Sequence, residues 1–277
     1  MSIPVLGVLF GVGLLVGLVS GLIGIGGGVL IVPFLYLFYA SPGWSGVEVS
    51  PVLATTVAHA TSLFIIVPTA LRGTWAYHRV GLVSWRAALP IAAGAMASAV
   101  VGALIAPVVP QHALRIAFGG LLTYTGFDLA REERRGVERE GRRPRLWTSL
   151  AAGLLVGVFS AMLGVGGGVI AIPLLIYVVG LDLQKVAATS LAIVMFSALA
   201  GTVTYGASGM GAGAPPGSIG YVHITAALPI LFGSVLSVRW GAALNQRLGR
   251  RRLRRLFSVL FLSLGIYLIV RNAILIV

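Results

Sequence analysis

The sequence contains no cysteine and few charged residues, and both shortages limit what the chain can be. The absence of cysteine excludes disulfide bonds, thiolate metal sites and cysteine nucleophiles. Charged residues make up 10% of the 277 positions, whereas a soluble domain carries roughly 25% because its surface must be hydrated. The first charged side chain is Glu48. A water-soluble fold is therefore excluded.

Apolar residues are abundant and lie in long uninterrupted runs. They make up 58% of the chain, and the mean hydropathy is +1.00. Runs of more than about 18 residues without charge are typical of membrane-spanning helices. The sequence predicts an all-α, polytopic protein of the plasma membrane, with little chain left for an extramembrane domain.

The chain contains two copies of one design. Residues 16–33 align without gaps on residues 156–173, and nine of the eighteen positions are identical. Weaker matches follow, among them Ala54-Thr55-Thr56 with Ala188-Thr189-Ser190. An internal repeat of this length indicates a duplicated structural unit. We expect a first transmembrane repeat over 1–130, a basic cytoplasmic linker over 131–146 and a second repeat over 147–277.

The net charge of +13 comes from Arg residues in short loops beside the spans, which is typical of cytoplasmic loops and not of nucleic-acid binding. If each repeat crosses the membrane an odd number of times, 17 of the 20 Lys and Arg residues fall on the cytoplasmic side, in loops 72–86, 131–147, 180–186 and 245–255. An even number would place the six Arg of 245–255 outside. The charges therefore predict two inverted repeats of about five membrane-entering helices each, with both termini outside.

An odd count requires each glycine segment to enter and leave on the same side. Residues 5–22 could form a helix of about 27 Å, but 29–40 reach only about 18 Å, less than the hydrocarbon thickness of about 30 Å. The second copy behaves alike, with arms over about 148–162 and 169–180. We expect two helical hairpins, broken at glycine, that meet near the middle of the membrane, where irregular backbone is tolerated only if it is buried or lines a cavity.

The glycine turns are the predicted substrate site. A glycine run permits a tight turn with positive φ, and the helix that follows presents free N–H groups and a positive dipole end to an anion. Close helix packing is the alternative interpretation, since small residues let backbones touch. The predicted glycine contacts are Gly24, Gly26, Gly27, Gly28, Gly164, Gly166, Gly167 and Gly168.

Side chains near the turns could complete such a site. The hydroxyls of Ser and Thr can donate to an anion, although in membrane helices they also bond to their own backbone. An intramembrane histidine is a candidate for substrate or proton contact, or else packs as a neutral ring. No acid is expected at mid-membrane, and no metal or cofactor is predicted. The predicted side-chain contacts are Ser20, Ser160, Thr55, Thr56, Thr189, Ser190 and His59.

One string, Gly206-Ala-Ser208-Gly209, matches the pattern of an intramembrane serine protease. It runs into a loop at the membrane surface, whereas that chemistry needs a buried Ser facing a His. An intramembrane enzyme is therefore an alternative without a credible nucleophile and base, and we expect no enzymatic activity.

The duplicated Gly-x-Gly-Gly-Gly-Val-x-x-x-Pro at Gly24–Pro33 and Gly164–Pro173 resembles the sulfite exporter TauE/SafE family of membrane transporters. The resemblance covers nearly the whole chain. It implies transport of sulfur-containing anions such as sulfite or organosulfonates, and it leaves open whether a proton is coupled.

These observations predict a secondary transporter that holds a small anion between the two glycine turns and exposes it alternately to either side of the lipid bilayer. An anion channel is the alternative within transport. A homodimer is compatible with the sequence.

Overall fold

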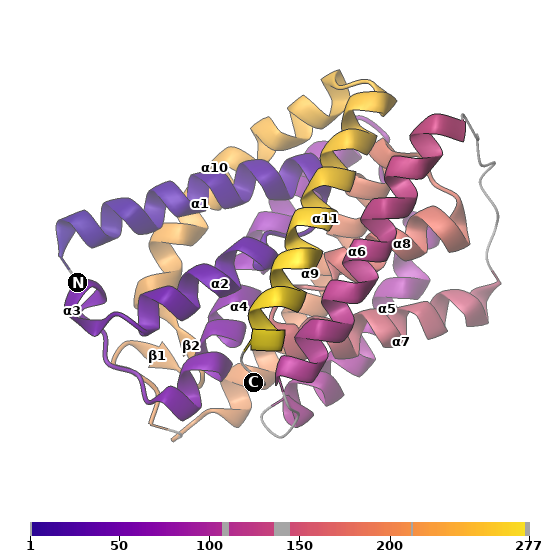
Figure 1. The fold of residues 1–277 in the computed structure, drawn as a ribbon. Coiled ribbons are helices and arrows are strands. Elements are labelled where there is room, and N and C mark those ends of the chain that lie inside the picture. Colours follow the sequence, from indigo (N-terminus) through magenta and orange to yellow (C-terminus); the bar gives the residue numbers. More distant parts are fainter. Residues whose placement is uncertain (1, 107–110, 136–144, 212, 275–277) are drawn as a thin grey trace.

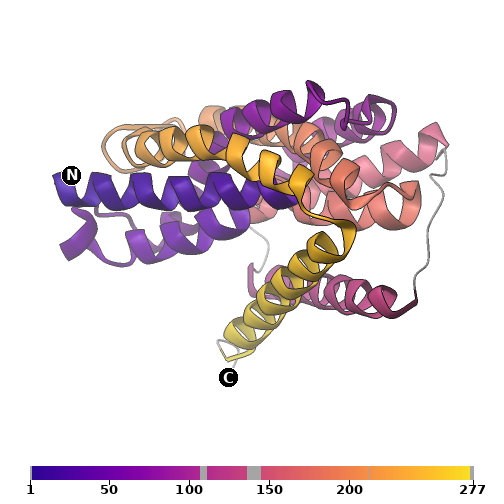
Figure 2. The same cartoon turned by 90° about the horizontal axis from the view of Figure 1, so that it is seen from above.

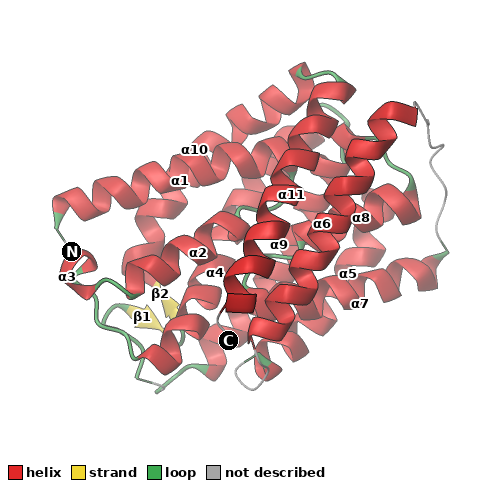
Figure 3. Cartoon of the chain, viewed as in Figure 1, coloured by secondary structure: helices red, strands yellow, loops and turns green. Residues whose placement is uncertain are grey.

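A computed structural model describes residues 2–106, 111–135, 145–211 and 213–274. Helices dominate the fold (Figures 1 and 3). The helices of the first half are α1 (Ile3–Ile23), α2 (Gly28–Tyr39), α3 (Pro42–Ser45), α4 (Pro51–His78), α5 (Trp85–Ile105) and α6 (Gln111–Arg135). Those of the second half are α7 (Leu146–Leu163), α8 (Gly168–Leu174), the π-helical turn η1 (Leu175–Val179), α9 (Leu183–Ser208), α10 (Ile224–Arg247) and α11 (Arg250–Ile274).

Six helices of the described residues are long and apolar enough to cross a membrane, namely α1, α4, α5, α7, α9 and α10. Two shorter apolar helices, Gly28–Tyr39 and Gly168–Val179, follow the glycine turns. Their lengths agree with the predicted returning arms of the hairpins. The prediction of an all-α polytopic membrane protein is confirmed.

Each half packs one of its helices against a helix of the other half. Helix α1 packs on α10 of the other half, and its counterpart α7 packs on α5. A Cβ atom added at Gly13 of α1 would lie 2.2 Å from the carbonyl oxygen of Ile230, and one added at Gly153 of α7 would lie 2.2 Å from that of Ile91. Glycine therefore allows backbone contact in both pairs, as expected for small residues between membrane helices.

Helices α4 and α9 pack against each other and carry the two glycine hairpins on their flanks. A Cβ at Gly73 would lie 2.8 Å from Cδ1 of Leu191, and a Cβ at Gly201 would lie 2.8 Å from Cδ1 of Leu63. In each helix, a glycine thus leaves space into which a leucine of the other helix packs. The pair forms the buried centre of the molecule.

Helices α6 and α11 form a pair along one flank (Figure 2). The Ser258 hydroxyl donates to the Gly126 carbonyl at 2.7 Å, and a Cβ at Gly265 would lie 2.4 Å from Oγ1 of Thr123. Since Gly126 and Gly265 are matched in the repeat, this pair is also formed from equivalent elements.

Some predicted loops are shorter than expected. Helix α4 continues through Arg72 to His78, and the guanidinium carbons of Arg72 and Arg79 lie 4.5 and 4.4 Å from the ring centre of Trp75. These cation–π contacts hold the two charged side chains against Trp75 in the part of the helix that continues beyond the apolar span. The predicted linker 131–146 begins inside α6, and its residues 136–144 lie outside the described part.

The connection between α9 and α10 contains a two-stranded antiparallel hairpin, β1 (Ser218–Ile219) and β2 (Val222–His223), drawn in yellow in Figure 3. Ser218 pairs with His223 in its register. Glycines with positive φ, Gly217 and Gly220, flank the short strands. The hairpin places His223 directly before α10.

Candidate functional site

The first glycine turn joins α1 to α2 through three left-handed residues. Gly24, Gly26 and Gly27 have φ values of 85°, 84° and 89°. The N–H of Gly24 donates to the Ser20 carbonyl at 2.8 Å, which ends α1. An L-residue with a side chain rarely adopts these angles, so the predicted positive-φ turn is confirmed.

The second turn repeats this conformation between α7 and α8. Gly164, Gly166 and Gly167 have φ values of 65°, 80° and 81°. In both copies the helix after the turn starts from the last of these glycines, since the carbonyl of Gly167 accepts from Ile170 and Ala171 as that of Gly27 does from Leu30 and Ile31.

The two turns touch each other through their backbones. A Cβ at Gly28 would lie 2.6 Å from Cα of Val165, and a Cβ at Gly168 would lie 2.5 Å from the carbonyl oxygen of Ile25. Residues 24–28 and 164–168 are all buried. In this conformation the contact leaves no space for an anion between Gly28 and Val165, so a substrate can enter there only when the turns separate.

Both turns rest on the same two side chains of α4 and α9. A Cβ at Gly26 would lie 2.6 Å from Cγ1 of Val194 and 3.3 Å from Cγ2 of Ile66, and at Gly166 the nearest atoms of both side chains are 3.1 Å away. The apolar pair Ile66 and Val194 therefore lies where the two hairpins meet.

His59 lies against the second turn. A Cβ at Gly164 would be 2.5 Å from Cα of His59, and the equivalent contact of Gly24 is with Ala187. His59 is 1% exposed, and its Nε2 shares a hydrogen bond of 2.5 Å with the Tyr36 hydroxyl. The structure thus brings His59 to the predicted site.

These contacts correct one part of the predicted repeat. His59 corresponds to Ala187, and residues 59–77 match residues 187–205 at ten of nineteen positions, including Ala-Thr-Ser-Leu in both copies. The earlier pairing of Thr55 and Thr56 with Thr189 and Ser190 is wrong by six residues. It failed because Ala-Thr-Thr at 54–56 also resembles Ala-Thr-Ser.

Thr55 and Thr56 lie half-buried near the start of α4. The true counterparts of Thr189 and Ser190 are Thr61 and Ser62, which the sequence analysis missed. A longer ungapped comparison of 59–77 with 187–205 would have found them.

Thr61 and Thr189 have matched hydrogen bonds away from the turns. Oγ1 of Thr61 accepts from the N–H of His223 at 3.0 Å, and Oγ1 of Thr189 accepts from the N–H of Ser84 at 3.1 Å. His223 and Ser84 immediately precede α10 and α5. Each threonine therefore anchors the start of a helix.

The serines around the second turn bond to its carbonyl groups. Ser190 donates to the Gly168 carbonyl at 3.4 Å, and Ser197 donates to that of Gly166 at 2.9 Å. Ser160 lies 3.4 Å from the Ser197 hydroxyl. Around the first turn, in contrast, Ser20 and Ser62 are fully buried, and neither hydroxyl has a hydrogen-bond partner among the described residues.

Two tyrosines complete the helix ends before the turns. Tyr77 donates to the Gly21 carbonyl at 2.6 Å, and Tyr205 donates to the Ala161 carbonyl at 3.0 Å. The last carbonyl groups of a helix have no intrahelical partner. These matched bonds fix the geometry from which both turns start.

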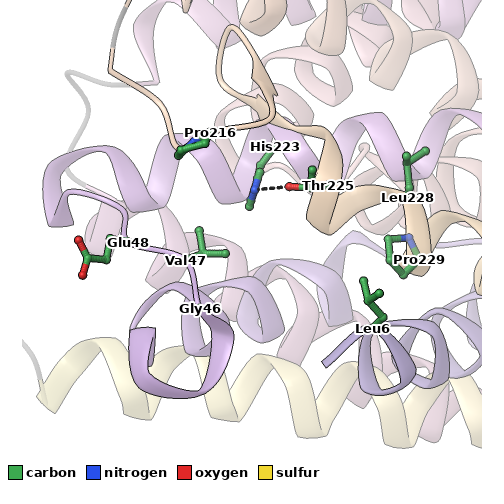
Figure 4. Close-up of a pocket in the computed structure, with 9 residues that line it drawn as sticks. All are labelled: Leu6, Gly46, Val47, Glu48, Pro216, His223, Thr225, Leu228 and Pro229. Atoms are coloured by element: carbon green, nitrogen blue, oxygen red, sulfur yellow. Dashed lines mark hydrogen bonds between the residues drawn. The ribbon is translucent and has the colours of Figure 1, made fainter. Parts of the chain in front are cut away.

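A cavity of about 890 Å³ opens beside the β-hairpin and the start of α10 (Figure 4). His223 points into it, and its ring bonds to the Thr225 hydroxyl at 2.7 Å through Nε2 and to the Tyr39 hydroxyl at 3.1 Å through Nδ1. Burial lowers the pKa of His223 to about 4. The cavity is lined by Leu6, Gly46, Val47, Glu48, Pro216, His223, Thr225, Leu228 and Pro229.

This cavity could not be predicted from the sequence, because its wall comes from four separate segments: α1, the loop before α4, the hairpin and α10. Ser208 of the protease-like string is exposed at the end of α9. Among the described residues, no group of three or more His, Asp or Glu side chains is arranged to hold a metal ion.

Known proteins with similar sequences are membrane transporters by name. The probable membrane transporter protein YunE of Bacillus subtilis is 25% identical over 97% of this chain and 98% of its own length. A probable membrane transporter protein of Haemophilus influenzae is 28% identical, covering 92% of this chain and 94% of its own. One of Methanocaldococcus jannaschii is 24% identical over 93% of both chains. No solved structure matches the chain.

Residues 9–268 match the sequence profile of the family described as Sulfite exporter TauE/SafE. The match covers both glycine turns, α1 from residue 9 onward and the other five long apolar helices in full. The resemblance inferred from the glycine motifs is confirmed: the chain belongs to the sulfite exporter TauE/SafE family and is a multi-pass membrane transporter of the plasma membrane.

Proposed function

We propose that the protein is a secondary transporter that binds a small oxyanion at its glycine turns and exposes it alternately to the two sides of the membrane. The observation that carries this proposal is the contact between the turns: two buried, left-handed glycine turns meet through their backbones. An apolar interior offers an anion few hydrogen-bond donors, and a helix that starts at such a turn supplies them from its first N–H groups.

An inverted arrangement of the halves supports alternating access. Figures 1 and 2 show α1 and its counterpart α7 running in opposite directions. Broken helices in inverted halves, with their ends near the midplane, recur in secondary transporters. If the α1–α10 pair and the α7–α5 pair exchanged their conformations, the protein would open toward one side of the membrane and close toward the other.

A carrier fits the centre of the molecule better than a channel does. Ile66 and Val194 lie against both turns, and Gly28 lies against Val165. A channel requires a continuous wetted path, whereas these apolar contacts close the path until the halves move. The alternative of an anion channel therefore requires a second, open conformation.

Family membership favours a sulfur oxyanion, sulfite or an organosulfonate, as the substrate. The cavity at His223 is lined in part by Leu6, near the start of α1, on the side predicted to face outward. His59 is our candidate for contact with a coupled proton, because it is buried beside Gly164.

Counterflow in proteoliposomes tests this function. Vesicles preloaded with unlabelled sulfite should accumulate external radiolabelled sulfite faster than empty vesicles, because a carrier exchanges substrate across the membrane. The same experiment with taurine, other organosulfonates and acetate gives the substrate range. Flux that ignores the preload and follows only the electrochemical gradient would establish a channel instead.

A further inference from the structure

We infer that the anion's oxygens are bound by the first glycine turn, through the hydroxyls of Ser20 and Ser62, and that the site selects a monovalent oxyanion. This inference rests on the proposed transport function. It distinguishes two turns that the sequence repeat makes equivalent.

The hydroxyls around the two turns differ in what they bond to. In the second turn, Ser190 and Ser197 donate to the carbonyl groups of Gly168 and Gly166. Their counterparts in the first half are Ser62, which has no partner within the described part of the chain, and Thr69, which bonds instead to Ser234 at 2.6 Å. The hydroxyl donor of Ser62 at the first turn is therefore unpaired, whereas its counterpart at the second turn donates to the backbone of that turn.

Ser20 is the second free donor. Its Cβ lies 3.7 Å from the position of a Cβ at Gly27, so the side chain borders the turn. It is 0% exposed and its hydroxyl has no partner in residues 2–106, 111–135, 145–211 and 213–274, whereas the matched Ser160 lies beside Ser197. We place Ser62 beside Gly28 because it matches Ser190, which bonds to Gly168, and because α4 packs on α2. A buried hydroxyl left unpaired is costly, and two beside one turn indicate a ligand that pairs with them.

Other buried hydroxyls without partners do not explain this difference. Among the residues that the structure describes, Thr74 and Thr202 also lack partners, but they are counterparts of each other and so occur in both halves. Ser218 lacks a partner as well, but it lies in strand β1 of the hairpin between α9 and α10. Ser20 and Ser62 are unpaired in one half only. The helix after the first turn, whose first N–H groups could donate to an anion, is also the more regular of the two. Helix α2 is an uninterrupted α-helix of 12 residues, whereas α8 changes to the π-helical turn η1 after seven.

The charges around the turn limit the ligand. The buried polar side chains of the described residues are Ser, Thr, Tyr, His and Asn, and no Lys or Arg is among them. Positive potential at the turn comes from N–H dipoles and hydroxyl protons. These can satisfy one negative charge, but a second buried charge would have no counter-ion. A sulfonate or hydrogen sulfite group fits this donor set, and the sulfate dianion does not.

Calorimetry on purified protein tests the inference with methanesulfonate as the monovalent probe and sulfate as the divalent one. We expect wild type to bind methanesulfonate at least tenfold more tightly than sulfate. Ser20→Ala and Ser62→Ala should each weaken methanesulfonate binding about tenfold or more, the loss of one hydrogen bond to a charged group. Both variants should melt at or above the wild-type temperature without ligand, because each removes an unpaired buried hydroxyl.

The matched variants Ser160→Ala and Ser190→Ala are the controls. They should weaken methanesulfonate binding clearly less than Ser20→Ala and Ser62→Ala do, because Ser160 and Ser190 lie at the second turn. Equal weakening by both pairs would overturn the assignment to the first turn and leave the proposed transport intact. So would loss of folding in Ser20→Ala or Ser62→Ala, since that would give those hydroxyls a structural role.

Equal affinity for sulfate and methanesulfonate would overturn the charge selection alone. If wild type binds neither anion yet shows sulfite counterflow, the whole inference falls while the transport function stands. If counterflow is absent as well, the proposed function falls with it.

Discussion

Gly28 of the first glycine turn lies directly against Val165 of the second, with an added Cβ only 2.6 Å from the Val165 Cα atom. Backbone atoms, unlike the end of a flexible side chain, cannot move aside without shifting the whole turn. The contact joins residues from opposite halves of the chain. It therefore fixes how closely the two hairpins approach.

We expect Gly28→Ala to lower stability by about 1–3 kcal/mol, the usual cost of overpacking. Gly11→Ala in α1 is the matched control, because a Cβ there meets nothing within 4 Å, and it should be neutral or slightly stabilising. Thermal unfolding of both variants in detergent gives the comparison. Equal melting temperatures for Gly28→Ala and Gly11→Ala would show that the two turns are not in contact in the purified protein.

His223 should make stability depend on pH. Its pKa is lowered from 6.5 to about 4 by burial. Between these values the unfolded chain binds more protons than the folded one. The contribution of His223 to the free energy of unfolding is therefore fully present above pH 6.5 and is lost as the pH falls toward 4. His223→Gln should flatten the melting temperature in this window relative to wild type. Parallel curves for the two proteins would contradict a buried, neutral His223.

His59 and its partner Tyr36 offer a test of proton contact. If His59 exchanges a proton during transport, His59→Gln should flatten the pH profile of sulfite flux. Tyr36→Phe removes the same 2.5 Å hydrogen bond but leaves the titratable ring, so it should keep the profile. Identical profiles in wild type and His59→Gln would give His59 a packing role.

The predicted inverted topology can be tested by labelling, because the chain has no native cysteine. Ser41 and Arg251 are both exposed. An impermeant thiol reagent added to intact cells should label Ser41→Cys and should label Arg251→Cys only after the cells are opened. Labelling of Arg251→Cys from outside would exclude inverted repeats with cytoplasmic 245–255.

Local patterns were enough to predict the hairpins. The repeated glycines at 24–28 and 164–168 specify left-handed turns because other residues are strained there, and the short apolar arms after them limit the helix lengths. The register between α4 and α9 was not predicted correctly. It depends on which residues meet across the centre, such as Gly201 with Leu63, and a three-residue match cannot specify that.

The remaining parts depend on contacts between distant segments. Tyr39 and His223 are 184 positions apart, and nothing near either residue in the sequence indicates that they bond. The free hydroxyls of Ser20 and Ser62 were equally hidden, since the repeat makes Ser20 and Ser160 look alike. Only their different neighbours, chiefly the orientation of Ser197 toward Gly166, separate the two turns.

We propose that the left-handed backbone of the first turn binds the transported anion, and a double variant separates this role from packing. A Cβ at Gly27 would lie 2.5 Å from Cγ1 of Val16, so Val16→Ala makes room for Gly27→Ala. The φ of 89° at Gly27 stays unfavourable for alanine, by about 1–2 kcal/mol.

The decisive measurement is sulfite counterflow by the monodisperse double variant Val16→Ala/Gly27→Ala, compared with Val16→Ala alone. We predict that Val16→Ala keeps most of the wild-type rate and that the double variant loses at least tenfold, because its turn can no longer present the same N–H groups to the anion. Equal rates in the two variants would contradict binding at the glycine turn.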